Sequence, residues 1–332
     1  MNSFGRNLRV QIFGQSHGEY VGLIIDGCPP GIEIAPEDFK EDIDRRKPGA
    51  KGTTPRKEDD FPEIVSGVYN GKSAGSPITI QFKNSNTRSG DYEKLRAVPR
   101  PGHADFVAHK KFNGFEDFRG GGHFSGRLTV ALVAAGVIAK KIIETFSGDK
   151  KINIAATILE IGGERDLEKG LQKAVDAKDS IGGIVECKVS NLPIGLGEPF
   201  FNSVESLISH AVFSIPAVKG IEFGAGFAAA KMFGIEHNDA IINPDGTTAT
   251  NNAGGIVGGI TNGNELVFRI VVKPTSSTPK EQQTLNVETG NVVPFSVKGR
   301  HDLCIALRVP VVLEAVTSMV LADLMMESRS YQ

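Results

Sequence analysis

Two histidines occur in settings that suit proton transfer. His17 lies in the stretch Gly-Gln-Ser-His-Gly, and His103 lies in Arg-Pro-Gly-His-Ala-Asp. Histidine is the side chain whose ordinary pKa lets it give or take a proton near neutral pH. Each of the two adjoins a glycine, which lets the backbone come close to a ligand. A hydrogen-bonded structural histidine is the alternative interpretation at both positions.

The charged residues near these histidines favour an anionic substrate. Arg100 precedes His103 and Asp105 follows it, so a cation, a proton carrier and a carboxylate occur together. Earlier in the chain, the segment 44–57 carries six Lys or Arg residues, among them Arg45 and Arg46, and no acid after its first residue. Guanidinium groups bind phosphate or carboxylate through paired hydrogen bonds. An exposed, solvated basic loop is the alternative interpretation of this segment.

Glycine-containing segments offer further anion sites. Residues 119–127 read Arg-Gly-Gly-Gly-His-Phe-Ser-Gly-Arg and lead into an apolar run, so free N–H groups and a helix dipole would face a ligand there. Residues 253–259 precede the turn Lys273–Ser277, and residues 298–302 hold Arg300 and Asp302. None of these segments matches the P-loop or the dinucleotide-binding fingerprint. Helix capping and ordinary turn chemistry are the alternative interpretations of these segments when each is taken singly. They explain residues 300–302 less well, because a cation, a proton donor and a carboxylate follow one another there.

The elements that position these residues are both strands and helices. Short β-branched runs predict strands at 8–14, 21–27, 63–69, 76–82, 152–161, 183–189 and 266–273. Asn70-Gly71 and Asn262-Gly263 each predict a hairpin turn between two strands. Helices are expected at 36–45, 128–145, 167–177, 203–213 and 310–326, and the two longest are apolar on more than one face. The sequence therefore predicts one α+β domain, residues 1–332, in which sheets pack on helices.

Composition limits the classes of protein to consider. The net charge is −2, so no global field draws the chain to nucleic acid or an anionic membrane. The cysteines Cys28, Cys187 and Cys304 are odd in number and widely spaced, which argues against a disulfide framework and against a metal site such as zinc. The N-terminal residues lack the apolar core of a signal peptide, and no apolar stretch is expected to reach the roughly 18 residues that span a bilayer. We therefore expect a cytoplasmic protein.

Taken in order, the motifs resemble those of the chorismate synthase family along essentially the whole chain. They are GQSHGEYVGLIIDGCPPG, DRRKPG, NTRSGDY, RPGHAD, RGGGHFSGR, GLGEPFF, AVKGIEFG, NNAGGIVGG, KPTSS and GRHD. The resemblance implies a β-α-β sandwich of antiparallel sheets with helices packed between them, assembled as a homotetramer. It also implies a lyase that removes phosphate and a proton from 5-enolpyruvylshikimate 3-phosphate by trans-1,4 elimination, with reduced FMN and no net redox. The product is chorismate, the last compound of the shikimate pathway, which feeds aromatic amino acid biosynthesis.

The resemblance also implies roles for individual residues. His17 and His103 would be catalytic acids, and Asp302 the base that serves the flavin. Arg45, Arg46 and Arg127 would bind substrate anions or NADPH. The expected FMN contacts are His123, Phe124, Ser125, Pro216, Ala217, Gly258, Lys273, Pro274, Thr275, Ser276, Ser277 and Arg300.

The chain departs from the family pattern at two of these places. Many relatives have Arg-Ser-Ser-Ala-Arg where this chain has residues 123–127, so His123 stands in place of a cation. Many also have asparagine at Pro216, which removes a side-chain amide. The resemblance leaves open whether the enzyme reduces its flavin with NADPH or depends on a separate flavin reductase.

The residue types suit this chemistry. The hydrogen lost comes from an unactivated carbon, so no simple side-chain base suffices, and reduced flavin can lend the electron density that helps phosphate leave. One rival hypothesis is an ordinary flavin oxidoreductase, which would consume pyridine nucleotide stoichiometrically. Another is a phosphate-ligand or RNA-binding protein without catalysis. That hypothesis expects stacking aromatics on a basic face, whereas this chain has no Trp and four Tyr.

Overall fold

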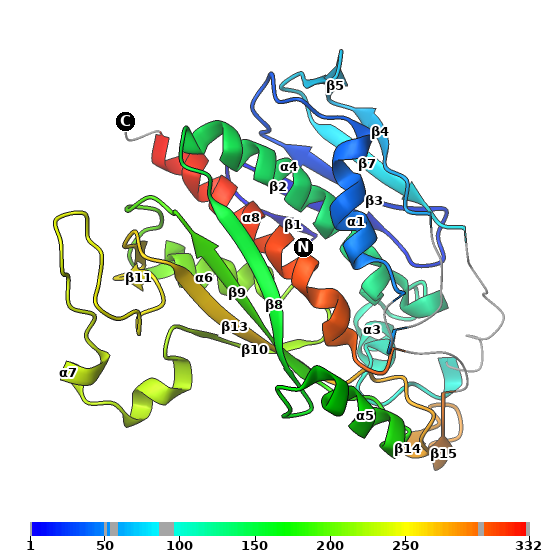
Figure 1. Cartoon of the computed structure of the whole chain (residues 1–332). Coiled ribbons are helices and arrows are strands. Elements are labelled where there is room, and N and C mark those ends of the chain that lie inside the picture. Colours follow the sequence, from blue (N-terminus) through cyan, green and yellow to red (C-terminus); the bar gives the residue numbers. More distant parts are fainter. Residues whose placement is uncertain (1, 50–51, 54–58, 86–95, 298–301, 330–332) are drawn as a thin grey trace.

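Two antiparallel sheets lie on either side of two long helices (Figure 1). The computed structural model describes residues 2–49, 52–53, 59–85, 96–297 and 302–329. The first sheet has the order β1 (Ser3–Phe4), β2 (Arg9–Gly14), β3 (Tyr20–Asp26), β7 (Ile78–Lys83) and β4 (Glu63–Ser66). The second has the order β10 (Val218–Phe223), β13 (Leu266–Val272), β9 (Gly183–Ser190) and β8 (Asn153–Ile161). All pairings between these strands are antiparallel.

The two long helices form the middle of the sandwich. Helix α4 (Thr129–Ser147) packs on the first sheet, α8 (Val309–Ser328) packs on the second, and the two helices pack on each other. They approach closely at Gly136, where an added Cβ would lie 2.4 Å from the Cβ of Ala315. Both helices are apolar on most faces because each is covered by a sheet and by the other helix. The expected α+β class and β-α-β layering are confirmed.

One expectation about apolar length was wrong. The helical stretch Ile305–Ser328 is long and apolar enough to cross a membrane by length and composition. In the fold, however, 78% of its most apolar window is buried between the sheets. Its apolar character is therefore that of a core helix.

Shorter elements surround this sandwich. The other α-helices that the structure describes are α1 (Lys40–Arg46), α3 (Asp105–Lys111), α5 (Leu167–Ala177), α6 (Val204–Val212) and α7 (Gly234–His237). The two-stranded pairs are β5 (Val68–Tyr69) with β6 (Lys72–Ser73), β11 (Ile256–Val257) with β12 (Ile260–Thr261), and β14 (Gln282–Leu285) with β15 (Val292–Phe295). The 3-10 turns are Pro36–Phe39, Arg119–Phe124, Gly126–Leu128, Phe200–Asn202, Gly226–Lys231 and Ile305–Arg308.

Two local predictions need correction. The strand expected at 63–69 is divided at Gly67, whose φ is +83° and whose added Cβ would lie 2.6 Å from the backbone of Ile78. The hairpin expected at Asn262-Gly263 does not form. Strand β12 pairs with β11, which precedes it in the chain, and not with β13, which follows it. The turn between β11 and β12 is Gly258-Gly259, and both residues have positive φ, as a two-residue hairpin turn of type I′ requires.

An arm, residues 224–255, extends from the second sheet and includes α7 (Figure 1, yellow). It leaves β10 at Gly224 and returns to the sheet through β11 and β12. Phe227, Phe233, Ile235 and Ile241 on the arm are each more than 70% exposed. Such a group of exposed apolar side chains is typical of a contact surface.

Candidate active site

A cavity of about 630 Å³ opens where the N-terminal strands, the glycine-rich turn before α4, the end of α6 and the segment after β13 meet. Part of its wall is polar and comes from loops, including Arg100, His103 and Ser125. The rest is apolar and comes from the strands and central helices, including Ile12 and Met319. Its size and mixed lining are those of a ligand site.

The cavity brings together most of the residues that sequence reasoning singled out. Its wall includes His103, His123, Phe124, Ser125, Pro216, Ala217, Lys273, Pro274, Thr275, Ser276 and Ser277. These residues come from four segments that are far apart in the chain. The antiparallel sandwich therefore places these residues around one cavity, and their functional roles stay predictions.

His103 is held by two charged neighbours. Its Nδ1 lies 2.6 Å from Asp105 Oδ1, and Arg100 donates to the same carboxyl group from Nε and Nη2 at 2.7 and 2.8 Å. Burial alone would raise the pKa of Asp105, but the hydrogen bonds from Arg100 and His103 outweigh burial and hold that pKa well below its usual range. Arg100 Nη2 also lies 3.1 Å from His103 Nδ1, and the ionised carboxylate favours the tautomer that carries its hydrogen on Nδ1, which leaves Nε2 for other partners.

Both predicted catalytic histidines contact one glycine turn. Gly120, Gly121 and Gly122 all have positive φ, a conformation that side chains with a Cβ rarely adopt. A Cβ at Gly120 would lie 2.5 Å from the His17 ring, and a Cβ at Gly121 would lie 3.2 Å from the His103 ring. The absence of side chains at these two positions therefore lets both rings pack against the same backbone.

The turn after β13 contacts the His103 loop directly. Lys273 Nζ donates to Gly102 O at 2.9 Å and to Ser276 Oγ at 2.8 Å, and Ser276 Oγ donates to Gly102 O at 2.7 Å. Burial, with a smaller contribution from Lys219, lowers the pKa of Lys273. The hydroxyl of Thr275 is buried and has no hydrogen-bond partner among the described residues. An ammonium group and an unpartnered hydroxyl thus lie together in the cavity wall.

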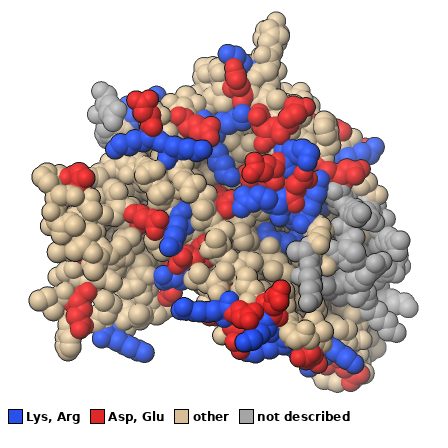
Figure 2. Space-filling model, in the orientation of Figure 1, with Lys and Arg blue, Asp and Glu red and all other residues tan. Residues whose placement is uncertain are grey.

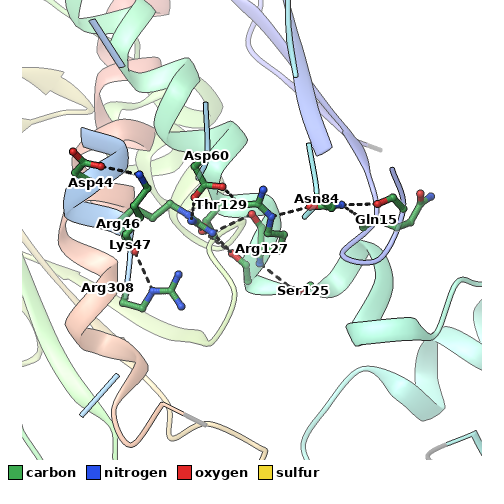
Figure 3. A network of polar contacts seen from close by, with 12 residues as sticks. Gln15, Asp44, Arg46, Lys47, Asp60, Asn84, Ser125, Arg127, Thr129 and Arg308 are labelled. Atoms are coloured by element: carbon green, nitrogen blue, oxygen red, sulfur yellow. Dashed lines mark hydrogen bonds and ion pairs between the residues drawn. The ribbon is translucent and has the colours of Figure 1, made fainter. Parts of the chain in front are cut away.

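Next to the cavity, two arginines share one buried carboxylate (Figure 3). Asp60 accepts from Arg46 Nη1 at 3.1 Å and from Arg127 Nη1, and all three side chains are at most 3% exposed. Arg46 also donates from Nε to Thr129 Oγ1 at 2.9 Å and from Nη2 to Arg127 O at 3.1 Å. Among the described residues, these two guanidinium groups contact one carboxylate, and Arg127 Nη2 is buried with no hydrogen-bond partner there. Such a group requires an anion or water.

Besides the predicted arginines, three predicted residues lie outside the cavity wall. His17 is buried beside Gly120, in the turn between β2 and β3, and Asp302 forms an ion pair with Arg308 at 3.5 Å. Gly258 lies in the β11–β12 turn, which contributes no residue to the cavity wall. Arg300 lies outside the described residues.

Arg45 contacts different partners from those of its neighbour Arg46. Its guanidinium donates to both carboxyl oxygens of Glu314 on α8, at 2.7 and 2.8 Å, and to Asp42 at 3.1 Å. Glu314 also accepts from the backbone N–H of Ala156 on β8 at 2.9 Å. The structure therefore brings Arg46 and Arg127 together and directs Arg45 to a helix–strand contact.

Sequence reasoning did not find Asp60, Asn84 or His210. Asp60 follows the basic segment in a short acidic run, and Asn84 ends a strand; nothing local distinguishes either from a solvated residue. His210, at the end of α6, lines the cavity beside Phe4. His123, which was expected, donates from Nδ1 to Gly14 O at 2.7 Å.

The fold and the site define an α+β enzyme whose cavity suits polyanionic ligands and carries groups for proton transfer. Comparison with known proteins identifies the family within this class of enzymes. The profile of the chorismate synthase family matches residues 8–326. The chorismate synthase of Chitinophaga pinensis is 69% identical over 331 residues, which cover 99% of this chain and 98% of that protein. The chorismate synthase of Korarchaeum cryptofilum is 43% identical, with 98% of this chain and 97% of that protein covered.

A solved structure agrees with these sequence matches. A crystal structure of chorismate synthase superposes with a TM-score of 0.74 at 26% identity, covering 98% of this chain and 93% of that one. The chain belongs to the chorismate synthase family, as its motifs predicted. The family consists of lyases that carry out the final step of the shikimate pathway.

Proposed function

We propose that this chain converts 5-enolpyruvylshikimate 3-phosphate to chorismate and phosphate with the help of reduced FMN. The observation that carries the proposal is the joint packing of His17 and His103 on one glycine turn at a cavity, near buried donors that have no hydrogen-bond partner among the described residues. A trans-1,4 elimination needs two anionic molecules held together and protons supplied at fixed places. The single chain, 1–332, is proposed to act as one catalytic domain.

The cavity wall fits FMN. The phosphate end of the cofactor needs a cation and free donors, and the Lys273 ammonium and the unpartnered Thr275 hydroxyl supply both. The ring system needs apolar wall, and β2, α4 and α8 supply it. We assign the cofactor contacts to the cavity residues 123–125, 216–217 and 273–277, with Arg300 and Gly258 retained as expected contacts from the family pattern. Reduced FMN would supply the electron density that lets phosphate depart, without net redox.

The substrate anions are assigned to the buried arginine pair. Arg127 Nη2 is a buried donor with no hydrogen-bond partner in the part of the chain that the structure describes, and Arg46 adds a second positive charge beside the shared Asp60. Charge-assisted hydrogen bonds of this kind are roughly twice as strong as neutral ones. Arg45 keeps its expected role in substrate or NADPH binding only as a prediction, since its guanidinium is bound to Glu314.

Proton transfer is assigned to three side chains. His17, beside Gly120, gives its proton to the departing phosphate. His103 holds a proton at the cavity wall, because Asp105 accepts its Nδ1 hydrogen and leaves Nε2 to face the ligand. Asp302 takes up the proton that remains after elimination, and its pairing with Arg308 fixes the direction of its carboxylate.

The assembly is proposed to be a homotetramer in the cytoplasm. The exposed apolar side chains of the arm support a subunit contact, and Figure 2 shows few charged side chains over the arm compared with the face above α1 and α4. All three cysteines are free and buried, and burial raises the pKa of Cys28 to about 11. Unpaired thiols suit a reducing compartment.

Anaerobic turnover tests the function. Purified protein is given 5-enolpyruvylshikimate 3-phosphate and FMN, and the FMN is reduced either by light or by NADPH. Chorismate and phosphate should appear in equal amounts in the light-reduced arm. Turnover with NADPH as well would indicate that the enzyme reduces its own flavin, whereas turnover with light alone would indicate a separate flavin reductase. No chorismate in either arm would refute the proposal.

A further inference from the structure

The side chain of Asn84 forms hydrogen bonds to the turn that carries His17. The turn, Gln15–Gly18, connects β2 to β3 and is closed by a hydrogen bond from Gly18 N to Gln15 O at 3.1 Å. Asn84, just after β7, donates from Nδ2 to both end carbonyls, at 3.1 Å to Gln15 O and at 2.8 Å to Gly18 O. Asn84 N also donates to Glu19 O at 3.0 Å. Asn84 therefore contacts both ends of the turn.

The same amide reaches the buried arginine pair. Asn84 Oδ1 accepts from Arg127 Nε at 2.9 Å, and Arg127 is joined through Asp60 to Arg46. Figure 3 shows the continuous path from Gln15 through Asn84 and Arg127 to Arg46. At the far end, Arg308 donates from Nε to Arg46 O at 3.1 Å, and Arg308 pairs with Asp302. The path thus connects the surroundings of a predicted acid and a predicted base.

We propose that Asn84 is a positioning residue for the elimination, because it fixes the His17 turn relative to the anion-binding arginines. The inference rests on the proposed roles of His17 and Arg127. It requires an amide at this position, since one group must accept from a guanidinium and donate to two carbonyls. A carboxylate can only accept, and an apolar side chain can do neither.

The consequence is geometric. Arg127 Nη2 is assigned to a substrate anion and His17 to the departing phosphate, so the distance between these two side chains decides whether the proton donor meets its target. Displacement by about 1 Å can reduce the rate of an enzymatic reaction by about a hundredfold. Asp60 holds Arg127 independently of Asn84. Loss of Asn84 should therefore disturb the His17 turn more than the anion site.

Asn84→Ala tests whether the loss of Asn84 disturbs the His17 turn more than the anion site. Asn153→Ala, at the exposed first residue of β8, is the matched control. In anaerobic turnover, Asn84→Ala should lower kcat at least about tenfold while KM stays within about threefold. Asn84→Asp should be no better, because it restores the acceptor for Arg127 but not the donor for the turn. The control should match the parent protein. Unchanged kcat in Asn84→Ala, or kcat restored in Asn84→Asp, would overturn the inference.

A double-mutant cycle with His17→Ala separates the possible failures. If Asn84 acts through His17, Asn84→Ala adds little further loss in the His17→Ala background, whereas independent effects would multiply. Multiplicative effects contradict the inference. Normal turnover of His17→Ala alone would instead reject the role of His17 in the proposed function. If Asn84→Ala does not fold, Asn84→Ser enters the same cycle with the same criteria.

Discussion

At the residue scale, the two histidines differ in how they are held. His103 has a partner for Nδ1 in Asp105, which Arg100 orients through two side-chain hydrogen bonds and one from its backbone N–H. His17 is buried against Gly120 in a turn held by backbone and Asn84 contacts. A ring with one nitrogen committed to a carboxylate keeps its orientation while the other nitrogen exchanges a proton. These settings suit one proton donor at the leaving group and another at the cofactor.

Both histidines should be required for turnover. Replacing either His17 or His103 by alanine should lower kcat by roughly 10²–10⁴, the range for a lost general acid or base. His109→Ala is the control, since His109 pairs with Glu116 and does not line the cavity described above. Single-turnover measurements with prereduced FMN check the result. Near-normal rates in both variants would indicate that the two histidines have structural roles only.

Asp105 should make the protein sensitive to acid. Its folded-state pKa lies below its unfolded value of about 4, so its ionised form stabilises the fold above that pH, and the contribution is lost as the pH falls through the folded pKa. Asp105→Asn should therefore be less stable than the parent at pH 7, and the difference should shrink below about pH 4. Urea unfolding at fixed protein concentration measures this. A difference that stays constant down to pH 3 would contradict it.

Some site residues could be found from the sequence and others could not. His103, Ser125 and Lys273 belong to motifs with glycine or proline neighbours, and these patterns carry local information. Asp60 and Asn84 form hydrogen bonds with residues 14 to 69 positions away in the chain. The residues next to them in the sequence do not indicate these contacts. Long-range hydrogen bonds become visible only when the fold brings the segments together.

At the element scale, the glycine turn should tolerate no side chain at Gly120. Gly120→Ala would place a Cβ 2.5 Å from the His17 ring and displace it, so kcat should fall at least about tenfold. Gly71→Ala is the matched control, because Gly71 also has positive φ, in the β5–β6 turn, but has open space around it. Both variants should lose about 1 kcal/mol of unfolding free energy. Equal kcat in the two variants would refute the contact argument.

Sequence patterns predicted the long elements better than the short ones. The apolar helices α4 and α8 and the strands β3, β7 and β9 match their predicted ranges closely, because burial on several faces gives a strong signal. The hairpin at Asn262-Gly263 failed because two adjacent glycines, Gly258 and Gly259, offered a competing turn. Strand β10, which pairs with β13, was not predicted, because its glycine and charged residues interrupt the apolar pattern that is typical of a strand.

At the scale of the whole molecule, the arm should hold subunits together. The double variant Phe233→Ser, Ile235→Ser removes two side chains that are 76% and 88% exposed in the single chain. If they lie in a subunit contact, the variant should lose the mass of a tetramer in light scattering, while Val175→Ser on α5 should keep it. A parent protein that is monomeric at micromolar concentration would contradict the proposed assembly.

The central claim is an elimination in which the reductant is not consumed, and counting product against electrons tests it most directly. A limiting amount of FMN is photoreduced once under anaerobic conditions, excess 5-enolpyruvylshikimate 3-phosphate is added, and chorismate, phosphate and flavin absorbance are followed together. The account predicts many equivalents of chorismate and phosphate for each FMN, with the flavin still reduced when substrate is exhausted. Flavin that becomes oxidised in step with product, or product limited to one equivalent per FMN, would contradict it.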